Sequence, residues 1–427
     1  MLDDLDQRLA LTGGRPVISG GFAPYSTIGA DEAAAVQKVF ERGILSGFYG
    51  SWGDEFLGGP EVRAFEAEWA ARFETPHAIS VNSATSGLYA ALGAVGIGPG
   101  DEVIVPPYTM SASVMGPLIY GAIPVFVDIE ADTFCLDLAK VREAITPKTK
   151  AIVAVNLFGH PARVAELMEI AREHGLKVIE DNAQGPLATE NGVYAGTIAD
   201  IGVFSLNYHK HIHTGEGGMC VTRDPELALR MQAIRNHAEN IVAAAPIADP
   251  VNMIGFNYRM TEMSAAVGRL QLAKIDRDVA PRQHLAERLS VGIAGLEGLT
   301  APVVREGCRH VYYVWSVKVD EAILGVSRAD FSAALAAEGF PHFLGYLRPL
   351  YLLPTFQQRI AIGRDGWPFT LTNRSYDKGL CPVAERMYEQ ELLCFETCAY
   401  HLDEAEVDSL IAAIRKVHSL RHQIARG

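Results

Sequence analysis

The chain has 427 residues and a formal net charge of −14, from 51 acidic and 37 basic side chains. This length allows two to three domains, or one large domain with a smaller one, and the 49% apolar composition is that of a globular protein. The acidic excess and the lack of Lys/Arg runs argue against a nucleic-acid-binding protein. No apolar run approaches the ~18 residues of a membrane span, and the apolar stretch near the acidic N-terminus is too short for a secretory leader. We therefore expect a cytoplasmic protein that binds neither nucleic acid nor membrane.

The six cysteines are scattered and form no CxxC pair. This pattern predicts reduced thiols rather than a zinc site or a redox motif.

Helical and strand-like stretches alternate along the first 275 residues, which is typical of an α/β fold. Nearly continuous apolar strands such as AIVAV (151–155) predict a parallel sheet that is covered by helices on both faces. We expect an N-terminal arm (1–30), a large domain (31–275) and a smaller C-terminal α/β domain (276–427). The predicted elements, in chain order, are a helix 31–42, a helix from about 86, strands 102–105 and 124–127, a helix 136–145, a strand 151–155, a helix 162–174, a strand 176–180, a helix 271–294 kinked or restarted at Pro281, a strand 310–319, and helices 328–338 and 403–421.

Ligands of such folds bind at the carboxyl ends of the strands. One of these ends carries the segment FSLNYHKHIHTGEGGM, in which Lys210 lies between an apolar strand and the glycine-rich TGEGG. A lysine that burial makes less basic is a nucleophile for carbonyl groups and forms an imine with an aldehyde cofactor. Taken alone, however, the segment fits a solvated lysine beside a plain turn.

Two further segments support the chemical interpretation. Asp181 in EDNAQG follows a predicted strand, where a buried carboxylate could pair with a protonated pyridine nitrogen, and Gln184 could bond the ring hydroxyl. A helix N-cap is the alternative for Asp181. In VNSATSGLYAAL, small hydroxyl residues precede a predicted helix, whose free N–H groups could bind a phosphate or simply be capped by these side chains.

The order of these segments resembles the sugar aminotransferase family, a branch of the fold type I pyridoxal-phosphate (PLP) aminotransferases. The resemblance extends over nearly the whole chain, from LSGFYGSWGDEFLGGPEVRAFEAEWA through VIVPPYTMSAS, LFGHPA and RNHAEN to GFNYRMTEMSAAVGRLQL. It implies a mostly parallel, seven-stranded sheet between helices and a smaller C-terminal domain. It also implies PLP as the cofactor and a homodimer with active sites at its interface.

The family pattern implies a role for each matching position. Lys210 would form the Schiff base with PLP and move the proton in transamination, Asp181 would pair with the ring nitrogen, and Gln184 would pair with the ring hydroxyl. The phosphate would be held by Thr85, Ser86 and Ser205, and by Asn257 of a second subunit.

This chain departs from the family pattern at several positions. Where the family places an aromatic residue that stacks on the cofactor ring, this chain has Met110, so either Met110 or nearby Tyr108 would stack. Asn156 and Ala238 replace a histidine and a glycine of the family pattern, which we expect to alter how substrate is held.

Histidines surround Lys210 at alternating positions, and an HxHxH pattern on a strand could bind a metal. No Asp or Cys cluster completes such a set. We therefore expect His209, His211 and also His237 to line the substrate pocket, with at least one of the histidines around Lys210 in a structural role and no metal. A related branch of the family replaces the lysine by histidine and dehydrates its substrate, but Lys210 favours transamination.

These features predict an aminotransferase that moves an amino group from L-glutamate or L-glutamine to a keto-sugar in amino-sugar biosynthesis. A nucleotide-linked sugar is the main interpretation, and a free keto-cyclitol or an unusual keto-sugar acid is the alternative. A PLP-binding homologue without turnover is a further, weaker alternative. For a nucleotide-linked substrate, we expect the excess acidic residues to lie away from Lys210.

Overall fold

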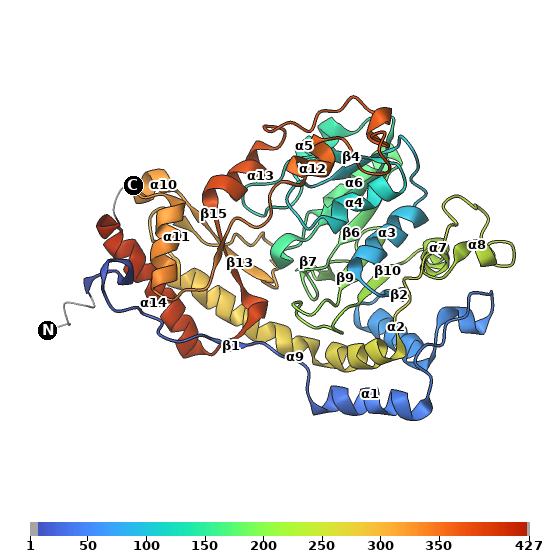
Figure 1. Cartoon of the computed structure of the whole chain (residues 1–427), viewed down its shortest axis with the longest axis horizontal. Helices are drawn as coiled ribbons and strands as arrows, with labels where there is room; N and C mark the ends of the chain where they lie inside the picture. The colour runs from blue at the N-terminus through green and yellow to red at the C-terminus, as the bar shows by residue number, and fades with distance from the viewer. Residues whose placement is uncertain (1–6, 425–427) are drawn as a thin grey trace.

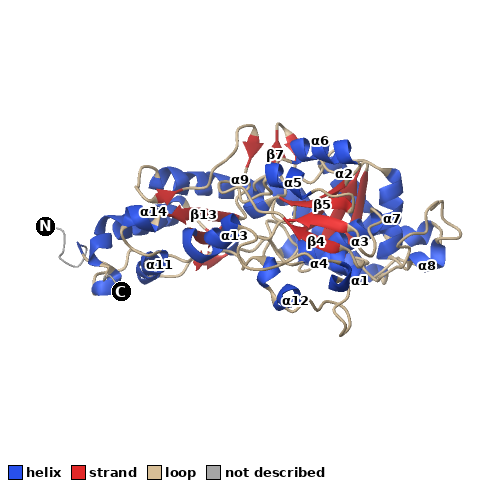
Figure 2. Cartoon of the chain, turned by 90° about the horizontal axis from the view of Figure 1, so that it is seen from above, coloured by secondary structure: helices blue, strands red, loops and turns tan. Residues whose placement is uncertain are grey.

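The computed structural model describes residues 7–424 and contains a central seven-stranded sheet between two layers of helices (Figures 1 and 2). The strand order is β2-β10-β9-β6-β5-β3-β4. Neighbouring strands are parallel except β10, which is antiparallel to both β2 and β9. The mostly parallel α/β sheet predicted from the sequence is therefore confirmed. The strands are β2 (His77–Val81), β3 (Glu102–Val105), β4 (Ile123–Phe126), β5 (Thr149–Val155), β6 (Lys177–Asp181), β9 (Ile201–Ser205) and β10 (Gly218–Thr222).

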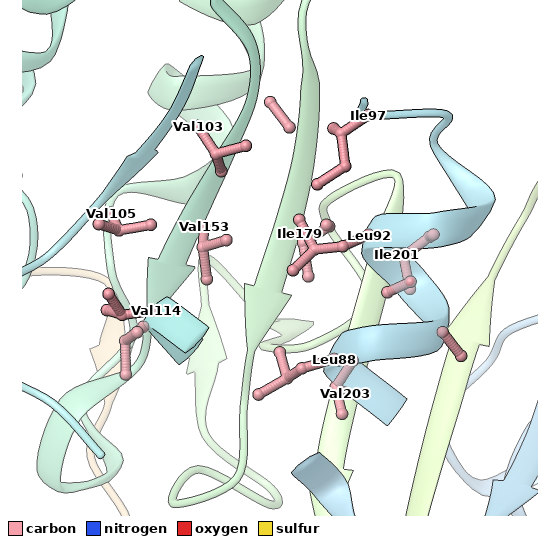
Figure 3. Close-up of a cluster of buried hydrophobic side chains, with 14 of the residues drawn as sticks. Leu88, Leu92, Ile97, Val103, Val105, Val114, Val153, Ile179, Ile201 and Val203 are labelled. Atoms are coloured by element: carbon pink, nitrogen blue, oxygen red, sulfur yellow. The ribbon is translucent and has the colours of Figure 1, made fainter. Parts of the chain in front are cut away.

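Apolar side chains cover both faces of this sheet, which explains why its strands are nearly continuous apolar runs. On one face, Val103, Val153 and Ile179 pack against Leu88 and Leu92 of α3 (Figure 3). The other face packs against α5 and α6, and a third cluster joins the sheet to α2 and α9. The helices of this domain are α1 (Ala30–Arg42), α2 (Pro60–Arg72), α3 (Ala84–Ala94), α4 (Ala112–Ile119), α5 (Leu138–Ala144), α6 (Val164–His174), α7 (Pro225–Arg235) and α8 (Ala238–Ile241).

The smaller sheet has four antiparallel strands in the order β11-β13-β15-β14. Trp315, Phe331 and Leu410 belong to the buried cluster between this sheet and its helices. The elements of this part are β11 (Leu299–Thr300), β13 (Val314–Val319), β14 (Phe343–Leu344), β15 (Leu392–Glu396), α10 (Glu321–Leu324), α11 (Arg328–Ala337) and α14 (Glu404–Leu420).

Helix α9 (Glu262–Ile293) runs between the two sheets across the lower part of the molecule in Figure 1, above α1. It begins nine residues before the predicted start at 271, and it is not interrupted at Pro281. Proline has no backbone N–H, so the carbonyl four residues earlier in the helix loses its usual hydrogen-bond donor. Arg277, whose carbonyl loses its usual partner, is exposed, so water can satisfy that group. The predicted restart at Pro281 is therefore wrong.

The segment 350–387 contains short helices, α12 (Pro354–Gln357) and α13 (Pro382–Arg386), rather than long regular elements. Leu350, Tyr351 and Phe356 share a buried cluster with the central sheet. This segment of the C-terminal half therefore packs on the central sheet.

The N-terminal arm reaches the C-terminal part of the chain, because β1 (Ala23–Pro24) pairs with β16 (Tyr400–His401). A further small sheet contains β7 (Thr189–Glu190), β8 (Val193–Tyr194) and β12 (Cys308–Arg309). Within residues 7–424, no helix is long and apolar enough to cross a membrane.

Candidate active site

A cavity of about 210 Å³ lies at the carboxyl ends of β6 and β9, beside the N-terminus of α3. This is the edge of the sheet where ligands of such folds bind. Seven of the residues singled out in the sequence line the cavity, namely Thr85, Met110, Asp181, Gln184, Ser205, His209 and Lys210. The structure therefore brings together residues that lie up to 125 positions apart in the chain.

Lys210 lies in the loop between β9 and β10, and its side chain is buried. Its backbone N–H donates to the carbonyl of Asn207, 2.9 Å away, which fixes the turn that carries the side chain. The ammonium Nζ lies 4.1 Å from the centroid of the Tyr313 ring. Burial lowers the pKa of Lys210 from 10.5 to about 8, against the opposing charges of Cys398, Asp181 and Glu396. A substantial fraction of this lysine is therefore neutral near physiological pH.

Asp181 is the last residue of β6, and its carboxyl group is buried. Its Oδ2 accepts a hydrogen bond from the hydroxyl of Ser113 at 2.6 Å, and its Oδ1 accepts one from the backbone N–H of Ala183 at 3.1 Å. Burial raises the pKa of Asp181, while the Ser113 bond and the nearby Lys210 charge favour the carboxylate. A cationic group in the cavity would favour the carboxylate further.

Gln184 is held by two hydrogen bonds. Its Oε1 accepts from the backbone N–H of Phe158 at 2.7 Å, and its Nε2 donates to the hydroxyl of Tyr346 at 2.9 Å. The backbone N–H of Phe158 needs an acceptor, and only the Oε1 end of the amide can accept. The Nε2 end therefore points toward Tyr346. Tyr346 comes from the C-terminal half of the chain and lines the same cavity.

The N-terminus of α3 is capped by Ser83, whose side chain accepts from the N–H of Ser86 at 3.0 Å. The Ser86 hydroxyl donates to Asn82 Oδ1 at 2.6 Å and lies outside the cavity lining. Thr85 is exposed and lines the cavity, as does Ser205 at the end of β9. The helix N-terminus therefore opens into the cavity with Thr85 and Ser205 as its nearest predicted hydroxyls.

The two candidates for stacking on a ring occupy different places. Met110 lines the cavity and is 55% exposed, whereas Tyr108 is fully buried outside it. The Tyr108 ring lies edge-on to Tyr346 at 6.1 Å between centroids. Met110 is therefore the better placed of the two.

The three histidines around Lys210 do not share one face, because residues 206–217 form a loop rather than a strand. His209 lines the cavity. His211 is fully buried outside it, and its Nε2 bonds the carbonyl oxygen of Val311 at 2.9 Å. His213 accepts from the N–H of Gly215 through Nδ1. Over the described part of the chain, His, Cys, Asp and Glu form no group that could hold a metal ion.

Two further predicted residues do not line the cavity of their own chain. Asn257 is exposed, and its Oδ1 accepts from Arg259 at 2.8 Å. The backbone of His237 has a positive φ of 56°, and its Nδ1 lies 3.5 Å from Glu239 Oε1.

Sequence reasoning missed four residues that shape the cavity: Ser113, Tyr313, Tyr346 and Glu216. Glu216 stands in the TGEGG motif, so its place near Lys210 could have been expected. Its carboxylate accepts from Asn207 Nδ2 at 3.0 Å. No spacing in the sequence links the other three to Lys210 or Asp181.

Comparison with known proteins identifies the family of this chain. Residues 51–415 match the model of the DegT/DnrJ/EryC1/StrS aminotransferase family. A Streptomyces venezuelae protein, dTDP-3-amino-3,4,6-trideoxy-alpha-D-glucose transaminase, is 37% identical over 335 residues, which cover 78% of this chain and 82% of that protein. The L-glutamine:2-deoxy-scyllo-inosose aminotransferase of Streptoalloteichus tenebrarius is 33% identical over 429 residues, which cover 97% of this chain and 98% of that protein.

A solved structure of similar fold is that of S. venezuelae DesV in complex with a ketimine intermediate. It has a TM-score of 0.77 and 33% sequence identity, and the match covers 91% of this chain and 94% of that one. The fold and the family resemblance expected from the sequence are thus confirmed. The chain belongs to the DegT/DnrJ/EryC1/StrS aminotransferase family.

Proposed function

We propose that this aminotransferase uses PLP to move an amino group from L-glutamate or L-glutamine to a ketone carbon of a sugar or cyclitol. The observation that carries the proposal is the meeting of Lys210 and Asp181 in one cavity at the carboxyl ends of β6 and β9. A nucleophilic amine and a buried carboxylate are the two groups that PLP chemistry requires of its protein.

The residues of the cavity fit this cofactor. The Lys210 ammonium is buried yet makes no hydrogen bond or ion pair with any residue in 7–424, so it is free to react with an aldehyde. Asp181 can pair with the pyridine nitrogen and Gln184 with the ring hydroxyl. Thr85 and Ser205, with the N-terminus of α3, can hold the phosphate, and Met110 can pack on the ring.

When bound, PLP supplies an electron sink that makes the Cα–H bond of an amino acid acidic. The pKa of Lys210 is lowered, so its Nζ can accept that proton from Cα and donate it to a carbon of the cofactor. The Tyr313 ring holds Nζ in place when it is protonated. Asp181 would keep the ring nitrogen of the bound cofactor protonated, and Ser113 holds the Asp181 carboxyl group in position.

We further propose a homodimer in which Asn257 completes the phosphate site of the partner subunit. Asn257 is exposed and does not line the cavity of its own chain, which supports this assignment. His237, which also lies outside its own cavity, would reach the substrate of the partner site in the same way. The six cysteines are free thiols, which supports a reducing, cytoplasmic location.

Two classes of ketone are candidates for the substrate that receives the amino group. Relatives that act on nucleotide-linked sugars support the main one. Two observations favour a free keto-cyclitol as the second. The cavity is lined by two carboxylates, Asp181 and Glu216, against the single cation Lys210, so the walls contributed by one chain offer no excess positive charge to a diphosphate. The expectation that acidic groups avoid Lys210 is thus wrong for Glu216. The inosose aminotransferase also matches 97% of this chain, against 78% for the dTDP-sugar transaminase.

The test is to incubate the PLP-loaded enzyme with L-glutamine or L-glutamate and a panel of ketones, and to detect the aminated product by mass spectrometry. The panel contains keto-cyclitols, free keto-sugars and nucleotide-linked keto-sugars. We expect one class to yield an amine. If no ketone is aminated and neither donor loses its amino group, the proposed function is wrong.

A further inference from the structure

The segment that precedes α9 carries Asn257, whose side chain is exposed although its backbone is held in place. Residue 257 forms an antiparallel bridge with Asn236, and its carbonyl oxygen accepts a hydrogen bond from Asn82 Nδ2 at 3.3 Å. The carbonyl of the next residue, Tyr258, accepts from the backbone N–H of Asn82 at 2.8 Å. Side chains two positions apart share a face of a paired strand segment, and Arg259 accordingly lies beside Asn257.

Three side chains here form a series of hydrogen bonds whose direction is fixed at the buried end. Asn236 is fully buried, and its Nδ2 donates to the backbone carbonyl of Tyr49 at 2.8 Å. Because a carbonyl oxygen can only accept, the other end of this amide, Oδ1, faces Arg259, whose Nη1 donates to it at 3.4 Å. Arg259 Nε donates in turn to Asn257 Oδ1 at 2.8 Å.

The contact with Arg259 decides which end of the Asn257 amide remains free. A guanidinium has donors only, so Asn257 must turn Oδ1 toward it, and Nδ2 is the end left to donate elsewhere. Nδ2 has no hydrogen-bond partner among residues 7–424. An exposed asparagine without such a contact can turn its amide either way, because the torsion of the terminal amide is nearly two-fold.

We propose that Arg259, anchored by Asn236, is a positioning residue that presents Asn257 Nδ2 as a hydrogen-bond donor to the cofactor phosphate of the partner subunit. This inference rests on the proposed function, which supplies both the PLP and the dimer. An ionised phosphate accepts hydrogen bonds, so an amide that turned its oxygen toward the phosphate would repel it. The charged guanidinium on Oδ1 also polarises the amide, which makes Nδ2 a stronger donor.

The test measures cofactor affinity by titrating the full-length, cofactor-free protein and reading the visible absorption band. The two probes are PLP and pyridoxal, which has the same aldehyde but no phosphate. We expect Arg259→Met to weaken PLP binding roughly tenfold and to change pyridoxal binding by about twofold at most. Arg415→Met is the matched control, because Arg415 is an exposed arginine of α14 that also donates to an oxygen, the carbonyl of Gly292 at 2.7 Å. This control should bind PLP as the wild type does.

A double-mutant cycle separates positioning from a general structural effect. If Arg259 acts through Asn257, then Arg259→Met should weaken PLP binding by about threefold at most in a protein that already carries Asn257→Ala. Asn257→Asp keeps the shape of the side chain and the bond from Arg259, but it replaces the donor by an oxygen. We therefore expect Asn257→Asp to bind PLP more weakly than Asn257→Ala does. Melting curves and light scattering establish that each variant is folded and has the oligomeric state of the wild type.

Three results would overturn the role of Arg259 while leaving the proposed function intact. They are an Arg259→Met protein that binds PLP as the wild type does, an equal loss of affinity for PLP and pyridoxal, and fully additive effects of Arg259→Met and Asn257→Ala. A wild-type protein that forms no visible band with PLP would overturn the proposed function, and this inference with it.

Discussion

The ammonium of Lys210 lies 4.1 Å from the centre of the Tyr313 ring, although the two residues are 103 positions apart. The ring faces a lysine that burial has made less basic, so it stabilises the protonated form by a cation–π contact where no residue of 7–424 bonds the ammonium. The Tyr313 hydroxyl donates a hydrogen bond to Glu396 Oε1 at 3.4 Å. Tyr313 therefore links the reactive amine to a carboxyl group at the end of β15.

The lowered pKa of Lys210 predicts how cofactor uptake depends on pH. Only the neutral amine attacks an aldehyde, and the pKa of Lys210 falls from 10.5 to about 8 because of burial. The rate at which cofactor-free protein gains its visible absorption band with PLP should therefore rise with pH, pass its midpoint near 8, and level off above it. A midpoint near 10 would contradict the burial of the free amine.

Replacing Tyr313 should move this midpoint. Tyr313→Leu removes the ring but keeps the site apolar, so the protonated lysine is less stable and the midpoint should fall by about 0.5 to 1 pH unit. Tyr313→Phe keeps the ring and is the matched control, with a midpoint close to that of the wild type. The contact has no role in holding the ammonium if the leucine variant keeps the wild-type midpoint.

Asp181→Asn should lower the rate constant of the half-reaction with the amino donor at least about a hundredfold, because an amide cannot keep the ring nitrogen protonated. Ser113→Ala removes only the 2.6 Å hydrogen bond to Oδ2, so we expect a smaller loss, of about tenfold or less. Single-turnover kinetics with L-glutamate measure both. Equal losses in the two variants would show that Ser113 does more than position Asp181.

Arg235 should stabilise the fold through Glu66. It is fully buried, its Nη1 lies 2.6 Å from Glu66 Oε1, and it also donates to the carbonyl of Ser80 at 3.0 Å. Arg235→Met leaves the Glu66 charge without its partner and should lower the free energy of unfolding by about 3 kcal/mol. Adding Glu66→Gln removes that charge and keeps an acceptor for Ser80, so the double variant should recover part of the loss. Urea unfolding measures this, and a double variant less stable than the single one would contradict the explanation.

The proposed dimer, with a site shared between two subunits, predicts complementation between impaired chains. In a mixture of Lys210→Ala and Asn257→Ala proteins, exchange of subunits creates one intact site in each mixed dimer, or about a quarter of all sites. Activity at limiting PLP should therefore exceed that of either protein alone. A mixture of Lys210→Ala with Asp181→Ala should show no recovery, because both changes lie in the same chain's site. Recovery in the second mixture, or none in the first, would contradict the role of Asn257.

The sequence predicted the central strands well because their apolar runs are buried on both faces, as for 102–105, which coincides with β3. It also predicted Lys210, Asp181 and Gln184, since these follow strand ends that meet at one edge of the sheet. It could not predict Tyr313 and Tyr346, which reach the cavity only through tertiary packing, or Ser113, which bonds Asp181. The histidines show the same limit: His209 and His211 are two residues apart, yet the loop turns one into the cavity and the other into the core.

The central claim is that Lys210 carries PLP chemistry in this cavity, and the absorption spectrum of the PLP-loaded protein tests it most directly. We predict a visible band that disappears when L-glutamate or L-glutamine is added, returns when the correct ketone is added, and is absent from Lys210→Ala. A wild-type band that neither donor changes, or a Lys210→Ala protein that still passes through the full cycle, would contradict the account.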